Sequence, residues 1–569
     1  MKNSKQMKKY NIALVAAAMA FAGVAHAENL TTEIKVERTV ETELPQASLL
    51  PSVYPAVQSL PVSTYRPQPT QYDRAVDFAP ETGNTELPLN ADPQSPDGRR
   101  GYVWAGYLPV YNAAIAAGYR LIDNGTTALG AAARFDGMSY KNKNRFNDFH
   151  MRDNSVGVKA DFSHHFKKGY SIGADASYFY AGLKSPTLHG NALSQNVNAA
   201  DVALKFAHTG SVPAYVTARY DYFGLGKDVP TVIFDGIQSL PHASDSRLLV
   251  EAGVALPLTR AQTSFFDIDV YTDFLNAKGV RWLSSTQFAT PDYSFSGIVG
   301  ILPGVRFSYR QVDIKLGAKI NMGVNSPGSV SHVAPNINLT WRPSGYLGIY
   351  GTFGGGERFH TLAEQYQLSS FAPSVTASSR SYTPVDGRVG FHLRPINNLY
   401  AGMYVGYAAT ERMPMLTVLN ADVPVFLPVN LSGWNFGFDA KYKHGKLFEA
   451  DASLRLYAHS YNSGSADAPD RAKVVMKLGA KAYPMPKLTV SADYTLRACR
   501  RYYVLWLDGA LTPMNMHNIS DLSLGGEYEV ERNLSVFLRL ENILCRRALV
   551  LPHIEQQSFH GLLGAQYRF

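Results

Sequence analysis

An alternation of apolar and polar side chains, repeating every two residues, runs through most of the chain from Gly101 onward. In 488–497, LTVSADYTLR, every second residue is Leu, Val, Ala or Tyr, and Thr, Ser, Asp and Arg stand between them. The same pattern recurs in 312–320 and 433–442. A period of two places the two classes on opposite faces of a β-strand. The fold must therefore accommodate one apolar face and one wet, charged face over several hundred residues.

A closed membrane barrel accommodates both faces at once. A soluble sandwich would need a second sheet over the apolar face, and linkers would divide so long a chain into domains. No such linker interrupts the sequence after Gly101. In a barrel, lipid covers the apolar face and a water-filled lumen takes the polar one. The sequence predicts an all-β, transmembrane antiparallel β-barrel over 101–569.

The connections between the alternating segments form two classes. Every second connection is a tight turn, such as DNGT at 123–126 and YRQ at 309–311. The connections between these turns are mostly longer, for example 224–244, 355–379 and 409–431. Counting segments gives about 22 strands, following the barrel rule of short periplasmic turns and long external loops. An even number places both barrel ends on the periplasmic side of the outer membrane of a Gram-negative bacterium.

The first 27 residues have the three parts of a signal peptide. Lys2, Lys5, Lys8 and Lys9 precede an apolar run that closes on the small-residue sequence AHA at 25–27. This is a basic region, an apolar region and a cleavage site. Removing four lysines lowers the formal charge from +8 to +4, too mild to indicate binding of nucleic acid. We expect an exported protein.

Residues 28–100 differ from the rest of the chain in composition. They contain ten prolines and little sustained periodicity, which favours extended or disordered chain over a packed domain. We expect this segment to occupy the lumen partly or to bind a periplasmic partner. Glu33, Ile34, Lys35 and Val36 alternate as a short strand that could add to the edge of a sheet in that partner.

The last ten residues, HGLLGAQYRF, alternate as a final strand that closes the barrel. Tyr567 and terminal Phe569 resemble the signature by which outer-membrane barrels are recognised for insertion. The last forty residues resemble the end of TonB-dependent receptor barrels. The residues that match this family are Asn542, Ile543 and Leu544 at the end of one strand and Gly564, Tyr567 and Phe569 in the last.

This resemblance implies a barrel of 22 strands, solute uptake and a TonB-like periplasmic partner at residues 33–36. The sequence departs from the family in the residues that precede the barrel. TonB-dependent receptors carry a folded plug domain ahead of the barrel, and the 73 residues of 28–100 are too few for a standard plug. We therefore expect a receptor-like barrel that lacks the folded plug.

Charged residues at the polar positions of the strands are predicted to face the lumen. They include Lys315, Lys319, Asp439, Lys441, Asp493 and Arg497. Over all strands whose alternation can be phased, ten basic residues stand against eight acidic ones, which predicts weak ion selectivity. The favoured alternative is that these residues form cross-strand ion pairs that stiffen the wall.

The two cysteines, Cys499 and Cys545, each precede two arginines where a strand meets an external loop. Strands separated by one neighbour lie about 10 Å apart, so a disulfide would require the loops to bend inward, and two free thiols are the alternative. No cysteine cluster or paired histidine motif proposes a metal or cofactor site. With no local catalytic motif, we expect no enzyme.

Two functions remain. The first is passage of a nutrient or another solute across the outer membrane. The second is a non-transporting barrel that anchors an envelope or surface-protein assembly complex. Loop 409–431 favours the second because it places an apolar patch in water, which usually has a partner. The patch consists of Met413, Met415, Leu416, Val418, Leu419, Val423, Val425, Phe426 and Leu427.

Overall fold

The computed structural model describes residues 100–569, with gaps at 110, 144–147, 187–191, 234–235, 241, 260–262, 281, 285–286, 290–294, 326–330, 369–379, 397, 420–422, 446, 462–465, 468–471, 507–509 and 552–553. The predicted signal peptide, the proline-rich segment and the predicted partner strand at 33–36 lie outside the described residues. They remain predictions.

One antiparallel sheet accounts for almost the whole described chain. Its first half contains β1 (Gly101–Leu108), β2 (Asn112–Asp123), β3 (Thr127–Lys143), β4 (Asp148–His165), β5 (Tyr170–Pro186), β6 (Ala192–His208), β7 (Ala214–Leu225), β10 (Ser244–Pro257), β11 (Ser264–Lys278), β14 (Phe295–Tyr309), β15 (Val312–Val324), β16 (Ser331–Pro335) and β17 (Ile337–Ser344). Its second half contains β18 (Leu347–Phe359), β19 (Arg380–Ile396), β20 (Leu399–Leu419), β21 (Val423–His444), β22 (Phe448–Tyr461), β23 (Ala466–Asp467), β24 (Ala472–Met485), β25 (Leu488–Leu505), β26 (Leu511–Met516), β27 (Ile519–Glu531), β28 (Leu534–Glu541) and β31 (His560–Arg568).

Short elements lie in the connections. They are η1 (Lys167–Gly169), the hairpins β8 (Val229–Ile233) with β9 (Gly236–Leu240), β12 (Trp282–Ser284) with β13 (Gln287–Ala289) and β29 (Leu549–Leu551) with β30 (Ile554–Glu555), and helix α3 (Leu362–Leu368). Among the described residues, no helix is both long enough and apolar enough to cross a bilayer.

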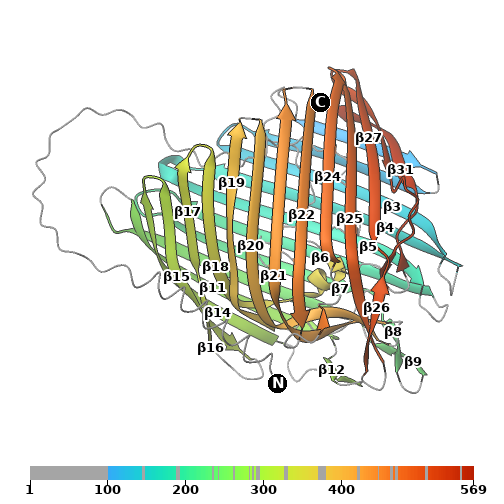
Figure 1. The fold of residues 1–569 in the computed structure, drawn as a ribbon, viewed down its shortest axis with the longest axis horizontal. Helices are drawn as coiled ribbons and strands as arrows, with labels where there is room; N and C mark the ends of the chain where they lie inside the picture. Colours follow the sequence, from blue (N-terminus) through green and yellow to red (C-terminus); the bar gives the residue numbers. More distant parts are fainter. Residues whose placement is uncertain are drawn as a thin grey trace, which may run out of the picture. The chain divides into compact units, whose positions relative to one another are not determined.

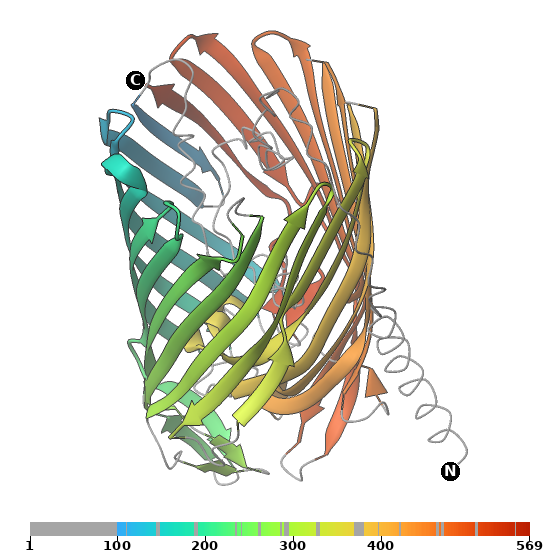
Figure 2. The same cartoon turned by 90° about the vertical axis from the view of Figure 1, so that its left-hand side faces the viewer.

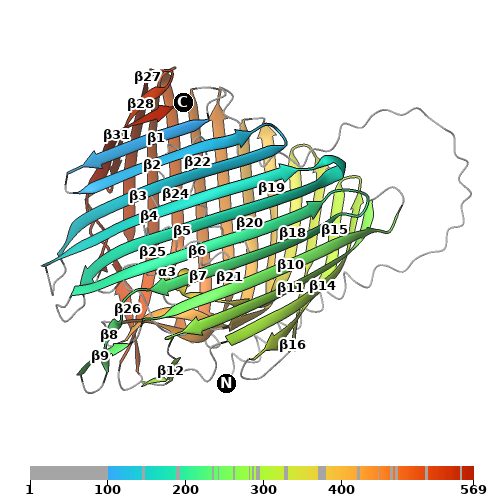
Figure 3. The same cartoon turned by 180° about the vertical axis from the view of Figure 1, so that it is seen from behind.

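The sheet closes into a barrel of 22 strands, which confirms the predicted fold class and count. Of its 25 strands, β16, β23 and β26 extend neighbouring spans, which leaves 25 − 3 = 22 around the barrel. The final strand β31 pairs with β1 and so completes the ring, as Figures 1 and 3 show from opposite sides. The closing strand predicted from the sequence is therefore correct.

Gly564 makes the closing seam tight. It lies opposite Gly106 across the pair of strands. A Cβ atom built on Gly564 would stand 2.1 Å from the carbonyl oxygen of Ala105, far inside contact distance. The backbones of β31 and β1 therefore meet at a position that only glycine fits.

The two faces of the wall follow the alternation of the sequence. In β21, Trp434 and Phe438 are 50% and 37% exposed on the outside of the sheet. Between them in sequence, Asn435 is buried, and the next polar position, Asp439, forms an ion pair with Arg455 of β22. The outer apolar face suits lipid, and the inner face carries the charge.

The two ends of the barrel differ as predicted. The predicted tight turns at 123–126 and 309–311 lie at strand junctions at the end where Arg100 and Phe569 meet, which we call the short-turn rim. The hairpins β8–β9 and β12–β13 and helix α3 belong to connections at the opposite end, the long-loop rim. On that side the connection between β1 and β2 is short, because β1 ends at Leu108 and β2 begins at Asn112.

One prediction about the long-loop rim is wrong. The apolar segment 409–431 is not an exposed loop, because β20 and β21 continue through it as paired strands from Met413 opposite Val429 to Leu419 opposite Val423. Met415, Leu416, Val418, Val425 and Phe426 are each at most 4% exposed. The apolar patch is therefore the inside of a core and not a surface.

Candidate functional site

Residues 411–419 of β20 and 423–429 of β21, which we call the lid, extend over the long-loop end of the barrel. The pairing of β20 with β21 shifts register between Thr410 and Met413, and Arg412 has a positive φ of 55°. Asn430 accepts a hydrogen bond from the Arg412 backbone N–H at 3.1 Å. Such a bulge bends a strand, and the lower ends of β20 and β21 curve away from the wall in Figure 1.

The tip of the lid pairs with a strand that is not its neighbour in the wall. Val418 and Leu419 align in parallel with Val504 and Leu505 at the end of β25. The Thr417 hydroxyl also donates a hydrogen bond to the Tyr503 carbonyl oxygen. In the wall itself, β25 stands four strands beyond β20.

An apolar core then carries the lid to the far wall. Its buried members are Tyr140, Met151, Leu416, Phe426, Tyr502, Met516 and Ile554. Tyr140 lies near the end of β3, which is ten strands from β20 in one direction around the barrel and twelve in the other. Its hydroxyl donates to the Glu555 carbonyl oxygen at 3.0 Å. The core therefore joins nearly opposite sides of the barrel mouth.

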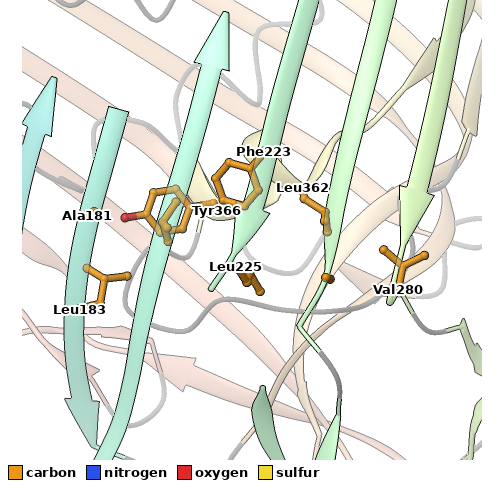
Figure 4. Close-up of a cluster of buried hydrophobic side chains, with 9 residues drawn as sticks. Ala181, Leu183, Phe223, Leu225, Val280, Leu362 and Tyr366 are labelled. Atoms are coloured by element: carbon orange, nitrogen blue, oxygen red, sulfur yellow. The ribbon is translucent and has the colours of Figure 1, made fainter. Parts of the chain in front are cut away.

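A second segment enters the lumen between β18 and β19. Figure 2 shows its short yellow helix α3 inside the ring of strands. Leu362 and Tyr366 of α3 pack into a buried cluster formed by β5, β6 and β7, drawn in Figure 4. The rings of Tyr366 and Phe223 lie 5.4 Å apart. Because β7 and β5 stand six and eight strands from β18, this segment also crosses the lumen.

Polar contacts hold the described start of this segment in place. The Leu362 backbone N–H donates to Asp245 Oδ2 at 2.6 Å, and Arg358 pairs with Glu364 at 2.7 Å. His360 Nε2 shares a hydrogen bond of 2.8 Å with the Ser381 hydroxyl, and its Nδ1 lies 3.3 Å from Glu364.

The surroundings lower the pKa of both His360 and Glu364. Burial lowers the pKa of His360, although Glu364 acts in the opposite direction. Burial would raise the pKa of Glu364, but the Arg358 charge and His360 outweigh it and hold that pKa below its usual range. Glu364 is therefore ionised, and His360 is neutral near pH 7.

Beneath α3 lies a cavity of about 820 Å³. Met413 at the base of the lid and residues of the α3 segment form part of its lining. The rest comes from strands β5–β7, β10, β11 and β14–β20. Its carboxylates are Asp201, Asp221, Asp245, Glu251, Asp269, Asp273, Glu357, Glu364 and Asp386, and its cationic side chains are Arg219, Arg247, Lys319, Arg358 and Arg388. The lining therefore has nine acidic side chains and five basic ones.

Several of these charges are paired across the wall. Arg219 Nε lies 2.7 Å from Asp201 and 2.8 Å from Asp221. Arg247 binds Asp273 through two hydrogen bonds of 2.7 and 2.8 Å. These guanidinium groups are committed to carboxylates of the protein. In the part of the chain that the structure describes, no three His, Cys, Asp or Glu side chains are arranged to hold a metal ion.

The predicted lumen charges are dispersed. Lys319 lines the cavity, and Lys315 lies 3.7 Å from Asp269. Asp439 binds Arg455 at 2.9 and 3.0 Å. Elsewhere in the wall stand Lys441, Asp493 and the buried Arg497. The structure therefore brings only Lys319 of the six to the cavity lining.

The predicted family residues at the two ends of the closing hairpin, formed by β28 and β31, differ in burial. Tyr567 and Phe569 are about half exposed and stack at 5.9 Å on the outer face near the short-turn rim. Asn542 is fully buried and has a positive φ of 47°, which Asn tolerates. Its side-chain N–H groups donate to the Arg546 and Gln557 carbonyl oxygens at 2.7 and 2.8 Å. It therefore pins the loop between β28 and β31.

The two cysteines are free and exposed. Cys499 lies within β25, and Cys545 follows the end of β28. Both have positive φ angles, of 57° and 52°. Of the two sequence alternatives, the structure shows free thiols.

Comparison with known proteins identifies the fold. No family model matches the sequence, and no curated protein matches it. Solved structures match 83% of the chain. The siderophore receptor PirA from Acinetobacter baumannii matches with a TM-score of 0.63 and 11% identity, and 80% of that chain is covered. The ferripyoverdine receptor of the outer membrane of Pseudomonas aeruginosa matches with a TM-score of 0.61 and 10% identity, and 72% of that chain is covered. The ferric enterobactin receptor PfeA from Pseudomonas aeruginosa matches with a TM-score of 0.59, 9% identity and 80% of that chain covered.

The fold is that of the siderophore-receptor barrels. At this identity the likeness concerns the arrangement of strands and not the ligand. Sequence reasoning found the strands of this siderophore-receptor fold but missed the lid and the cavity. A signal for the lid was present, because both faces of segment 413–419 are apolar, as in a strand covered on two sides.

Proposed function

We propose that this chain is an outer-membrane barrel through which a solute passes into the periplasm. The observation that carries the proposal is the polar cavity in the lumen, covered on the long-loop side by the α3 segment and the lid. A barrel that served only as an anchor would need no polar chamber of this size. The fold shared with siderophore receptors supports the same function.

The lid and the α3 segment define where passage is controlled. An open barrel of 22 strands has a lumen wide enough to leak. Apolar packing of the lid against β25 and β3 would block one end of the lumen through described residues alone. We propose that the long-loop rim faces outside and that a solute enters when these two segments move.

Flux through the purified full-length protein tests the proposal. Reconstituted into liposomes and planar bilayers, the wild type should show low conductance. A variant in which residues 412–429 are replaced by a short Gly-Ser linker should show large, stable channels and rapid sugar-driven swelling. Circular dichroism and heat-modifiable migration in gels should show that the variant barrel is intact. An intact variant barrel that still conducts no ions would contradict solute passage.

A TonB-like partner for residues 33–36 remains a proposal supported by the resemblance of the closing hairpin. The related receptors suggest the partner, and the alternating sequence supplies a strand for it. The anchoring function has lost its main support, because the apolar segment that required a surface partner is buried within the chain.

A further inference from the structure

We propose that the cavity beneath α3 binds a small organic cation, and this inference rests on the proposed solute passage. The excess of carboxylates lies mainly on one wall. Strands β6, β7, β10 and β11 contribute six acids and two arginines to the lining. The acids are Asp201, Asp221, Asp245, Glu251, Asp269 and Asp273.

Asp245 is a buried carboxylate on this wall. Its residue is only 4% exposed, and Oδ2 accepts the Leu362 N–H. Oδ1 has no hydrogen-bond partner among the described residues, and no cationic side chain forms an ion pair with this carboxylate there. A buried carboxylate in this state is costly unless a donor or a cation meets it. Its position on the cavity lining allows a bound ligand to do so.

Glu251 supplies a second acceptor on the same strand. It lines the cavity, and its carboxylate makes no hydrogen bond and no ion pair within 4.0 Å in the described part of the chain; Arg247 and Lys319 are the cationic side chains that act on it from farther away. Asp245 and Glu251 are six positions apart in β10, an even spacing that puts both on the inner face. Their Cα atoms lie about 20 Å apart along the strand, so the two carboxylates offer acceptors for cationic groups at two places in the cavity.

The remaining lining favours a cation with a hydrocarbon body. Aromatic rings of Tyr215, Tyr271 and Tyr350 face this cavity, and such rings attract ammonium groups. Arg219 and Arg247 are held by wall carboxylates, so they are not free to bind an anionic solute. A volume of about 820 Å³ is that of a site for a small organic molecule.

Calorimetry on the full-length protein in detergent tests the inference, with spermidine as the probe. Citrate and maltose serve as the anionic and neutral comparisons, and Mg²⁺ as the metal comparison. We expect saturable binding of spermidine alone. Asp245→Asn and Glu251→Gln should each weaken it by about tenfold, the usual loss for a hydrogen bond to a charged group. Asn keeps an acceptor for the Leu362 N–H, so the α3 segment should stay in place.

Asp493→Asn is the matched control, because Asp493 lies on β25 and outside the cavity lining. It should change spermidine affinity by less than about twofold, an effect too small for a direct contact. Equal effects of all three variants would overturn the assignment, and so would saturable citrate binding or binding of Mg²⁺ without spermidine.

The two proposals can fail separately. If spermidine does not bind but the lid-replaced barrel passes sugars, only the cationic ligand is wrong. If spermidine binds as expected but the lid-replaced barrel passes nothing, the cavity is a binding site and solute passage is wrong.

Discussion

The two segments that cross the lumen come from adjacent hairpins, yet they are held by different forces. The lid is fixed by backbone pairing with β25 and by a core of large apolar side chains. The α3 segment contributes only Leu362 and Tyr366 to a cluster made mainly of wall residues, and otherwise depends on His360, Glu364 and Asp245. Apolar burial responds little to pH, whereas buried titratable groups respond strongly. We infer that the lid is the stable seal and the α3 segment is the movable part.

The largest effect should follow from breaking the lid core. Leu416 is fully buried there, and losing its contacts alone costs about 2–5 kcal/mol. Leu416→Lys adds the cost of burying a charge, so we expect the lid to open and single-channel conductance to rise. Leu447→Lys, in a turn where Leu447 is 62% exposed, should leave conductance unchanged. If the conductance of Leu416→Lys stays at the wild-type level, the lid does not close the lumen.

The next effect separates the outer face of the wall from its inner face. Phe436→Arg places a cation toward lipid, which costs about 2–4 kcal/mol near the middle of a bilayer. Asp439→Asn removes one side of an ion pair with Arg455 in the lumen. We expect the first to impair assembly, measured as the folded fraction in outer membranes, and the second to assemble normally. Equal yields would contradict the assignment of the two faces.

The α3 segment should respond to acid where the lid does not. Because burial lowers the pKa of His360, the closed segment binds fewer protons than a released one. Its stability is complete above the ordinary histidine pKa of about 6.5 and falls as pH drops below it, by up to about 1.4 kcal/mol per pH unit.

Hydrogen exchange of the 360–368 backbone measures this opening. We expect exchange to quicken from pH 7 to pH 5, after correction for the intrinsic rate, while residues 415–418 of the lid stay protected. His360→Gln cannot gain the proton, so its exchange should be independent of pH. An unchanged pH dependence in His360→Gln would assign the effect to another group.

The sequence predicted the parts of this fold that local rules decide. Alternation along β21 and turn residues such as those at 123–126 depend on neighbouring residues only, so the strands, turns and closing strand β31 could be recognised. The lid could not, because the bend at Arg412 and the distant strand β25 decide its position. The cavity depends on which strands become neighbours: Asp201 and Arg219 meet only because β6 pairs with β7 in one register.

The smallest change should come from the segment ahead of the barrel. Residues 28–100 are expected to occupy the lumen or bind a periplasmic partner, yet the lid closes the long-loop rim by contacts among described residues alone. Deleting Thr31 to Pro96 should therefore raise conductance only slightly. In the Leu416→Lys background the same deletion should raise it further, because two obstructions act in series. Planar-bilayer conductance, with growth sensitivity to a large antibiotic, compares the four chains. If the deletion adds nothing to Leu416→Lys, the proline-rich segment does not enter the lumen and its role is to bind a partner.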